Sequence, residues 1–104
     1  MHTVAVLVMP DTIAFDATMP IEAFGRVQLS TGAPGYDVMV CGTEPVVQAG
    51  PMGIAADHGL GALAGADTIV VAGRYDVTAP VPDGVLTALR AAFAAGVRVA
   101  SICA

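Results

Sequence analysis

The sequence predicts an α/β fold in which a mostly parallel β-sheet is sandwiched between helices. Apolar, β-branched runs occur at residues 3–9, 36–42, 68–72 and 97–103, without the alternation of a half-exposed strand. Such runs are typical of parallel strands buried on both faces. Helical patterns separate several of them, which favours right-handed βαβ units. The composition agrees, because 56% of the residues are hydrophobic and only 12% are charged, against about 25% charged in typical soluble domains.

The first half of the chain predicts a strand, a loop, a helix and a second strand. Turn residues Pro-Asp-Thr at 10–12 close the strand at 3–9. Residues 13–20 are expected to form a loop that presents Asp16. A helix is expected from Pro20 to about Leu29, with Thr18 as its N-cap. The strand at 36–42 follows, with Cys41 in its interior.

The second half predicts a hairpin at 45–56, a short helical piece from 60 to about 64, and a strand at 68–72. A helix is expected over 83–95, with Asp83 as N-cap and Gly96 as C-cap. Its expected buried face consists of Val85, Leu86, Leu89 and Phe93. The last strand is expected to be buried and to carry Cys103 at its tip. The predicted order is β-α-β-(β-β)-α-β-α-β, within one domain and without a linker.

Composition excludes several classes of function. The net charge is −5 with only four Lys and Arg residues, so these residues are not expected to contact nucleic acid, which requires a basic surface. No apolar run approaches the roughly 18 residues of a membrane span, and the N-terminus lacks the basic region of a signal peptide. The two cysteines have no metal-ligand spacing, and no glycine-rich phosphate loop occurs. We expect no metal, no cofactor and a reduced, cytoplasmic protein.

Cys103 and Asp16 are the first candidates for chemistry. Both follow predicted parallel strands, so both are expected at the carboxyl edge of the sheet, where open α/β folds place their ligands. The alternatives are an inert core cysteine and an ordinary loop carboxylate. If the two side chains meet, an ionised Asp16 disfavours the thiolate, whereas a protonated Asp16 stabilises it by donating a hydrogen bond.

Gly73 and Arg74 are expected to line the same edge, because they follow the strand at 68–72. A glycine there permits close approach, and the N–H of either residue is a candidate oxyanion donor. A plain turn glycine and a solvated loop are the alternatives. Cys41 is expected in the core, and His58 as a capping or packing residue.

Several segments together resemble the ThiJ/PfpI superfamily, which has the class I glutamine amidotransferase-like, flavodoxin-like fold. They are V-A-V-L-V-M-P at 4–10, F-D-A-T-M-P at 15–20, I-E-A-F-G at 21–25, A-D-H-G-L at 56–60, A-D-T-I-V-V-x-G at 66–73 and V-A-S-I-C-A at 99–104. Within the superfamily, the segments at 20–25 and 56–60 are most similar to the sensor domains of AraC-type transcriptional regulators. Isocyanide hydratases share the Asp-x-Thr-x-Pro pattern that runs from Asp16 to Pro20.

The resemblance implies that Cys103 is the cysteine of a nucleophile elbow, that Asp16 is its acidic partner, and that Gly73 is the glycine after the strand that borders the pocket. It also implies that residues 1–104 form the N-terminal part of one such domain, ending after the elbow strand, with any DNA-binding domain outside this segment. Large exposed apolar patches mark interaction sites, and a homodimer is expected. A ligand-sensing domain is the first interpretation. A cysteine-dependent hydratase or amidase-like enzyme, or a domain with a merely structural or redox-sensitive thiol, remains open.

Overall fold

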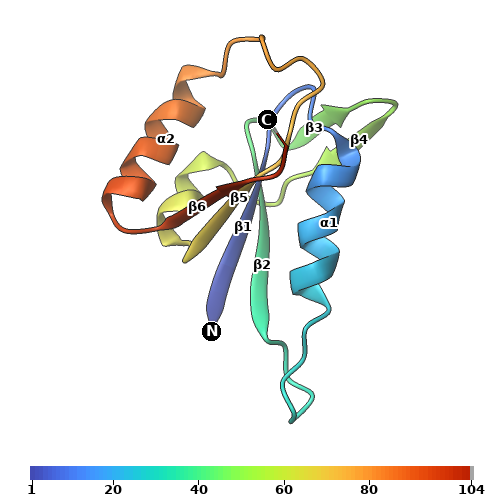
Figure 1. Ribbon diagram of the computed structural model, residues 1–104, viewed down its shortest axis with the longest axis vertical. Helices are drawn as coiled ribbons and strands as arrows, with labels where there is room; N and C mark the ends of the chain where they lie inside the picture. The colour runs from blue at the N-terminus through green and yellow to red at the C-terminus, as the bar shows by residue number, and fades with distance from the viewer. Residues whose placement is uncertain (104) are drawn as a thin grey trace.

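A computed structural model describes residues 1–103, which form a parallel four-stranded sheet with helices on both faces (Figure 1). The strand order is β2-β1-β5-β6, and every pairing in this sheet is parallel. A separate antiparallel hairpin consists of β3 and β4. The strands are β1 (His2–Val8), β2 (Tyr36–Gly42), β3 (Val46–Ala49), β4 (Met52–Ala55), β5 (Thr68–Val71) and β6 (Arg98–Ser101). The predicted α/β class and element order are confirmed.

β1 lies at the centre of the sheet because its apolar run is suited to burial on both faces. It pairs with β2 along one edge and with β5 along the other. Its side chains alternate between two cores. Leu7 packs with Leu63 and Val85 beneath η1 (Leu60–Gly65) and α2 (Asp83–Ala94). Val6 packs in the second core with Ala17 of α1 (Ala14–Gly25) and with the hairpin.

α1 begins well before Pro20, so the expected loop at 13–20 is wrong. Ile13 is the N-cap, and Pro20 lies inside the helix, where it is buried. The cause is the tight turn after β1, in which the Thr12 hydroxyl donates to the Met9 carbonyl at 2.6 Å and accepts from the Met9 N–H at 3.0 Å. This turn reverses the chain in so few residues that the helix begins at once. Asp16 therefore lies in the first helical turn.

The expected cap at Thr18 is wrong for the same reason. Thr18 is already helical, and its hydroxyl donates back to the Phe15 carbonyl at 3.3 Å. Pro20 has no N–H for the bond to the carbonyl four residues earlier. α1 nevertheless continues to Gly25, where the prediction extended to Leu29.

α2 and β6 differ from the prediction in what they bury. Pro82, not Asp83, is the N-cap of α2, and Ala95, not Gly96, is its C-cap. The buried side chains are Val85 and Ala92. Phe93, expected in the buried face, is 73% exposed. β6 is exposed along its length and pairs only with β5 among residues 1–103. Because no described strand lies beyond β6, the side of α2 next to that edge has nothing to pack against.

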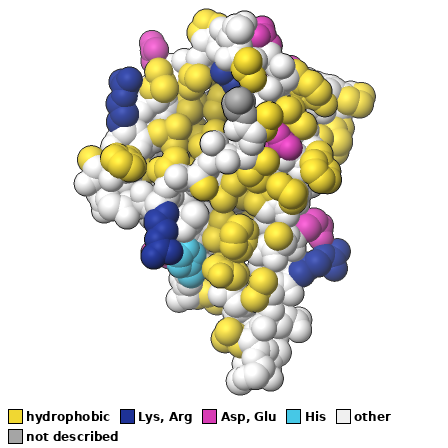
Figure 2. Space-filling model, in the orientation of Figure 1, with side chains coloured by type: hydrophobic (Ala, Val, Ile, Leu, Met, Phe, Trp, Pro, Cys, Tyr) yellow, Lys and Arg dark blue, Asp and Glu magenta, His cyan; other side chains and the backbone are white. Residues whose placement is uncertain are grey.

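Hydrophobic side chains are consequently visible between α1 and α2 in Figure 2. The exposed ones include Phe15 and Met19 of α1, Phe93 of α2 and Val99 of β6. No helix within residues 1–103 has the length and apolar character needed to cross a membrane.

Candidate functional site

Gly73 lies between Asp16 and Cys103 at the carboxyl edge of the sheet. A Cβ atom placed on Gly73 would lie 2.6 Å from Asp16 Oδ2, 3.0 Å from Cys103 Cβ and 2.9 Å from the Ile102 carbonyl oxygen. β1 and β6 are not neighbours, since β5 separates them. The carboxyl group and the cysteine therefore meet across the end of β5, and the missing side chain of Gly73 makes the space for both.

Asp16 is buried, with 8% of its surface exposed. Its backbone N–H donates to the Ile13 carbonyl at 3.0 Å within the first turn of α1, where the helix dipole favours a negative charge. Its Oδ2 atom is buried and has no hydrogen-bond partner among the residues that the structure describes. Buried polar atoms are nearly always paired, so an unpaired one calls for an explanation. This oxygen lies against Gly73 and Cys103, where no described residue donates a hydrogen bond to it.

Cys103 has the conformation of a residue on a sharp turn. Ile102 still continues the sheet, donating its N–H to the Val71 carbonyl at 3.0 Å. Cys103 then adopts a φ of 70°, in the left-handed region that non-glycine residues rarely occupy. Strained backbone of this kind clusters at active sites and ligand clamps, and a nucleophile elbow has such a turn. The Cys103 side chain is exposed, so small reagents reach it.

Gly73 and Arg74 serve this edge in different ways. The Gly73 carbonyl accepts from the Ile13 N–H at 2.8 Å, which ties the start of α1 to the end of β5. The Arg74 guanidinium donates to the carbonyls of Ala79 and Pro80 at 2.9 and 3.3 Å. Arg74 was predicted to bind ligand. In the structure its guanidinium group, which could bind an anion, is hydrogen-bonded to the loop that follows it.

A cavity of about 240 Å³ opens beside Cys103. Its walls are mostly apolar and come from the end of β1, from β5 and the loop that follows it, from α2, and from the end of β6 and the residues after it. They include Met9, Val71, Val81, Val85, Leu86, Leu89 and Ile102. Gly73, Arg74, Ser101 and Cys103 line the cavity as well, so both predicted ligand-lining residues, Gly73 and Arg74, border it.

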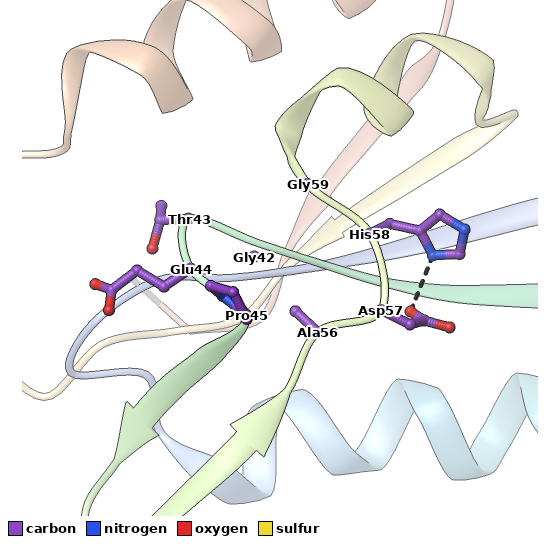
Figure 3. A pocket seen from close by; sticks show the side chains of 8 residues that line it. All are labelled: Gly42, Thr43, Glu44, Pro45, Ala56, Asp57, His58 and Gly59. Atoms are coloured by element: carbon purple, nitrogen blue, oxygen red, sulfur yellow. Dashed lines mark hydrogen bonds and ion pairs between the residues drawn. The ribbon is translucent and has the colours of Figure 1, made fainter.

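A second cavity, of about 300 Å³, lies at the end of β2 (Figure 3). There Asp57 Oδ1 lies 2.9 Å from His58 Nδ1, and this hydrogen bond is the main cause that lowers the pKa of Asp57. Figure 3 shows Thr43 and Glu44 on one side and Asp57 and His58 on the other, with their polar ends directed apart. These groups do not converge on one point, so this cavity lacks the arrangement found at Gly73.

Cys41 belongs to the core, as predicted, with no exposed surface. Burial, and secondarily the charge of Asp57, raises the pKa of its thiol to about 11. The thiolate is the reactive form of cysteine, so Cys41 is unsuited to nucleophilic chemistry. Within the described part of the chain, no group of three or more His, Cys, Asp and Glu side chains is arranged to hold a metal ion.

No family model and no curated protein matches the sequence. Solved structures match closely in shape. Toxoplasma gondii DJ-1 in its oxidised form aligns over 99% of this chain and 56% of its own, with a TM-score of 0.74 and 22% identity. Drosophila melanogaster DJ-1β aligns over 99% and 55%, with a TM-score of 0.76 and 20% identity. An AraC family transcriptional regulator from Pseudomonas putida aligns over 97% and 64%, with a TM-score of 0.75 and 16% identity.

These similarities show an α/β fold with a parallel sheet between helices. The fold is that of the DJ-1/ThiJ/PfpI superfamily, which confirms at the level of the fold the resemblance found in the sequence. The chain spans about half the length of most of the solved structures that it matches.

Proposed function

We propose that this chain provides the ligand-sensing site of a transcriptional regulator of the AraC type, with the ligand held at Asp16, Gly73 and Cys103. The observation that carries the proposal is Asp16 Oδ2, a buried oxygen without a described partner, which lies against Gly73 and Cys103, two residues that line the cavity of about 240 Å³. A ligand with an N–H or O–H group completes that hydrogen bond. The shape similarity to the regulator from Pseudomonas putida supports the regulatory role.

Thermal denaturation tests the sensing site. A ligand present at 100 times its Kd stabilises the folded state by about 2.7 kcal/mol. For a domain of this size that corresponds to a Tm increase of about 10–20 °C. A library of small amides, hydroxy acids and amino acids should contain compounds that raise the Tm of the wild-type chain.

Two variants identify the site that such compounds occupy. Asp16→Asn keeps the shape of the side chain but changes its hydrogen-bonding, and should abolish the Tm increase. Asp37→Asn, an exposed carboxylate on β2, is the matched control and should retain it. Equal responses of the two variants would rule out a site at Asp16.

The regulatory part of the proposal concerns the gene. The net charge of −5 with four basic residues is unsuited to DNA, so the DNA contact is assigned to a separate basic domain. Reading the gene beyond the codon for Ala104 should reveal a basic helix-turn-helix segment. A reading frame without a basic helix-turn-helix segment would contradict the proposed regulatory role.

We also propose a homodimer and a cytoplasmic location. The exposed apolar side chains of α1 and the hairpin support the dimer, since Phe15 is 70%, Val46 58% and Met52 48% exposed. Light scattering should give twice the monomer mass, and a monomer at micromolar concentration would contradict the proposal.

A cysteine-dependent hydratase or amidase-like enzyme is the second candidate, favoured by the left-handed Cys103 beside Asp16. In this chemistry the Cys103 sulfur forms a bond to the terminal carbon of an isocyanide, and the same carbon takes up a proton supplied through Asp16, which gives a thioimidate with one C–H bond and a C=N double bond. Water then adds to the thioimidate carbon, the carbon–sulfur bond breaks, and the formamide and thiol are released. Turnover of isocyanides or simple amides that Cys103→Ser abolishes would favour the enzyme, whereas turnover unchanged by Cys103→Ser would exclude it.

A further inference from the structure

The turn between β1 and α1 contains a second strained residue, Asp11, which the sequence marks only as a turn residue. Its φ is 72°, in the left-handed region. Among the non-glycine residues that the structure describes, only Asp11 and Cys103 have a positive φ. Asp and Asn tolerate this conformation better than other non-glycine residues. Asp11 follows β1 and Cys103 follows β6, so both strained residues lie at the carboxyl edge of the sheet, as Gly73 does.

Asp11 joins three separate segments through hydrogen bonds. Its N–H donates to the Gln48 carbonyl of β3 at 3.2 Å, and its own carbonyl accepts from the Tyr75 N–H at 3.1 Å. Its Oδ2 accepts from the Asp76 N–H at 2.9 Å. One residue thus connects the β1–α1 turn to the hairpin and to the loop after β5.

The same turn then connects directly to the candidate site. Thr12 forms an antiparallel bridge with Arg74, and the Ile13 N–H donates to the Gly73 carbonyl at 2.8 Å. α1 begins at the next residue and carries Asp16 in its first turn. The position of the Asp16 carboxyl relative to Gly73 therefore depends on how the turn at 11–13 is fastened to the loop at 73–76.

We infer that Asp11 is a positioning residue, which acts through this turn to hold the Asp16 carboxyl against Gly73 and Cys103. The inference rests on the proposed function, because it requires that Asp16 influences what happens at Cys103. Asp11 does not itself touch the reacting atoms. Its left-handed backbone sets the direction of the turn, and its Oδ2 fixes the turn to the loop after β5.

The pH profile of Cys103 alkylation by iodoacetamide is the test, because the thiolate is the reacting form. Asp16→Ala is the reference variant, measured in the full chain. Because it removes the carboxyl group, it should displace the pH profile of Cys103 alkylation relative to wild type. Asp11→Ala and Asp11→Gly should displace it in the same direction, by about half as much or more, because a hydrogen bond weakens steeply as its distance and angle change. Gly accepts the left-handed conformation, so Asp11→Gly removes only the side-chain bond.

Two controls separate positioning from general destabilisation. Asp11→Asn keeps an acceptor oxygen and tolerates the left-handed conformation, so it should retain the wild-type profile; it also removes the charge and thus excludes a direct effect of that charge. Gly32→Ala, at a φ of 85° with open space around it in the α1–β2 loop, introduces comparable backbone strain far from the site. It should lower the Tm without moving the profile.

The outcomes distinguish the inference from the function on which it rests. Unchanged profiles in Asp11→Gly and Asp11→Ala, with Asp16→Ala displaced, would reduce Asp11 to a structural residue and leave the site intact. An unchanged profile in Asp16→Ala would overturn both the site and the inference. A displaced profile in Asp11→Asn would show that charge, not position, is responsible, and would also overturn the inference.

Discussion

Gly73→Ala perturbs the candidate site most directly. The new methyl group would lie 2.6 Å from Asp16 Oδ2, 2.9 Å from the Ile102 carbonyl oxygen and 3.0 Å from Cys103 Cβ. The Asp16 oxygen ends a short side chain and can rotate away, but the other two atoms belong to or adjoin the backbone. Inserting a methyl group into such a crowded place costs about 1–3 kcal/mol, which corresponds to a Tm decrease of about 4–24 °C in a domain of this size.

The assay is thermal and urea denaturation of wild type, Gly73→Ala and a matched control. Gly61→Ala is that control, because nothing lies within 4 Å of the added atom; its stability should stay within about 0.5 kcal/mol of wild type. Gly73→Ala should also change the rate of Cys103 alkylation, since the methyl group enters the space between the thiol and the carboxyl. Wild-type stability together with wild-type alkylation in Gly73→Ala would refute the close approach of Asp16 and Cys103.

Three further results are expected. Under native conditions at pH 8, iodoacetamide should modify Cys103 alone, and Cys41 should react only after denaturation, because burial raises the pKa of Cys41 to about 11. Mass spectrometry of peptides locates the labelled cysteine, and labelling of Cys41 in the folded protein would contradict this expectation. Thr12→Val should lower the free energy of unfolding, measured by urea denaturation, by about 1–3 kcal/mol, because the fully buried Thr12 hydroxyl accepts and donates hydrogen bonds in the turn. An unchanged free energy of unfolding would contradict this role of the hydroxyl. The hydrogen bond from His58 lowers the pKa of Asp57, so its stabilising effect is present above the unfolded value near 4 and is lost as the pH falls through the lower folded value. The stability difference between wild type and Asp57→Asn should therefore shrink in that range, and a difference that grows there would contradict the assignment.

The helix that carries Asp16 shows where sequence reasoning was insufficient. Pro20 is typical of a first helical turn, and this preference placed the helix start too late. The turn formed by Thr12 and Met9 decided otherwise, because its bonds reverse the chain before Ile13. The expectation that Asp16 lies near the carboxyl edge survived the error, since either placement follows β1.

The error in α2 had a different cause. The apolar stripe of the helix is wider than the surface that the described sheet offers to it. Val85 lies over the sheet and is buried, whereas Phe93 lines an open hollow beside Val99 of β6 and is exposed. A helical pattern reports which side chains are apolar, and only the neighbouring elements determine which of them are covered.

The sequence by itself determined the α/β class, the strands and their parallel pairing, because uninterrupted β-branched runs separated by helices have few other ways to bury themselves. It also placed Asp16, Gly73 and Cys103 at one edge of the sheet, since parallel strands all end on the same side. Only the tertiary structure decided that the carboxyl and the cysteine meet across Gly73, that the Asp16 oxygen is left without a described partner, and that Asp11 fastens the turn beside them. Those features depend on contacts between residues far apart in the chain, which no local pattern encodes.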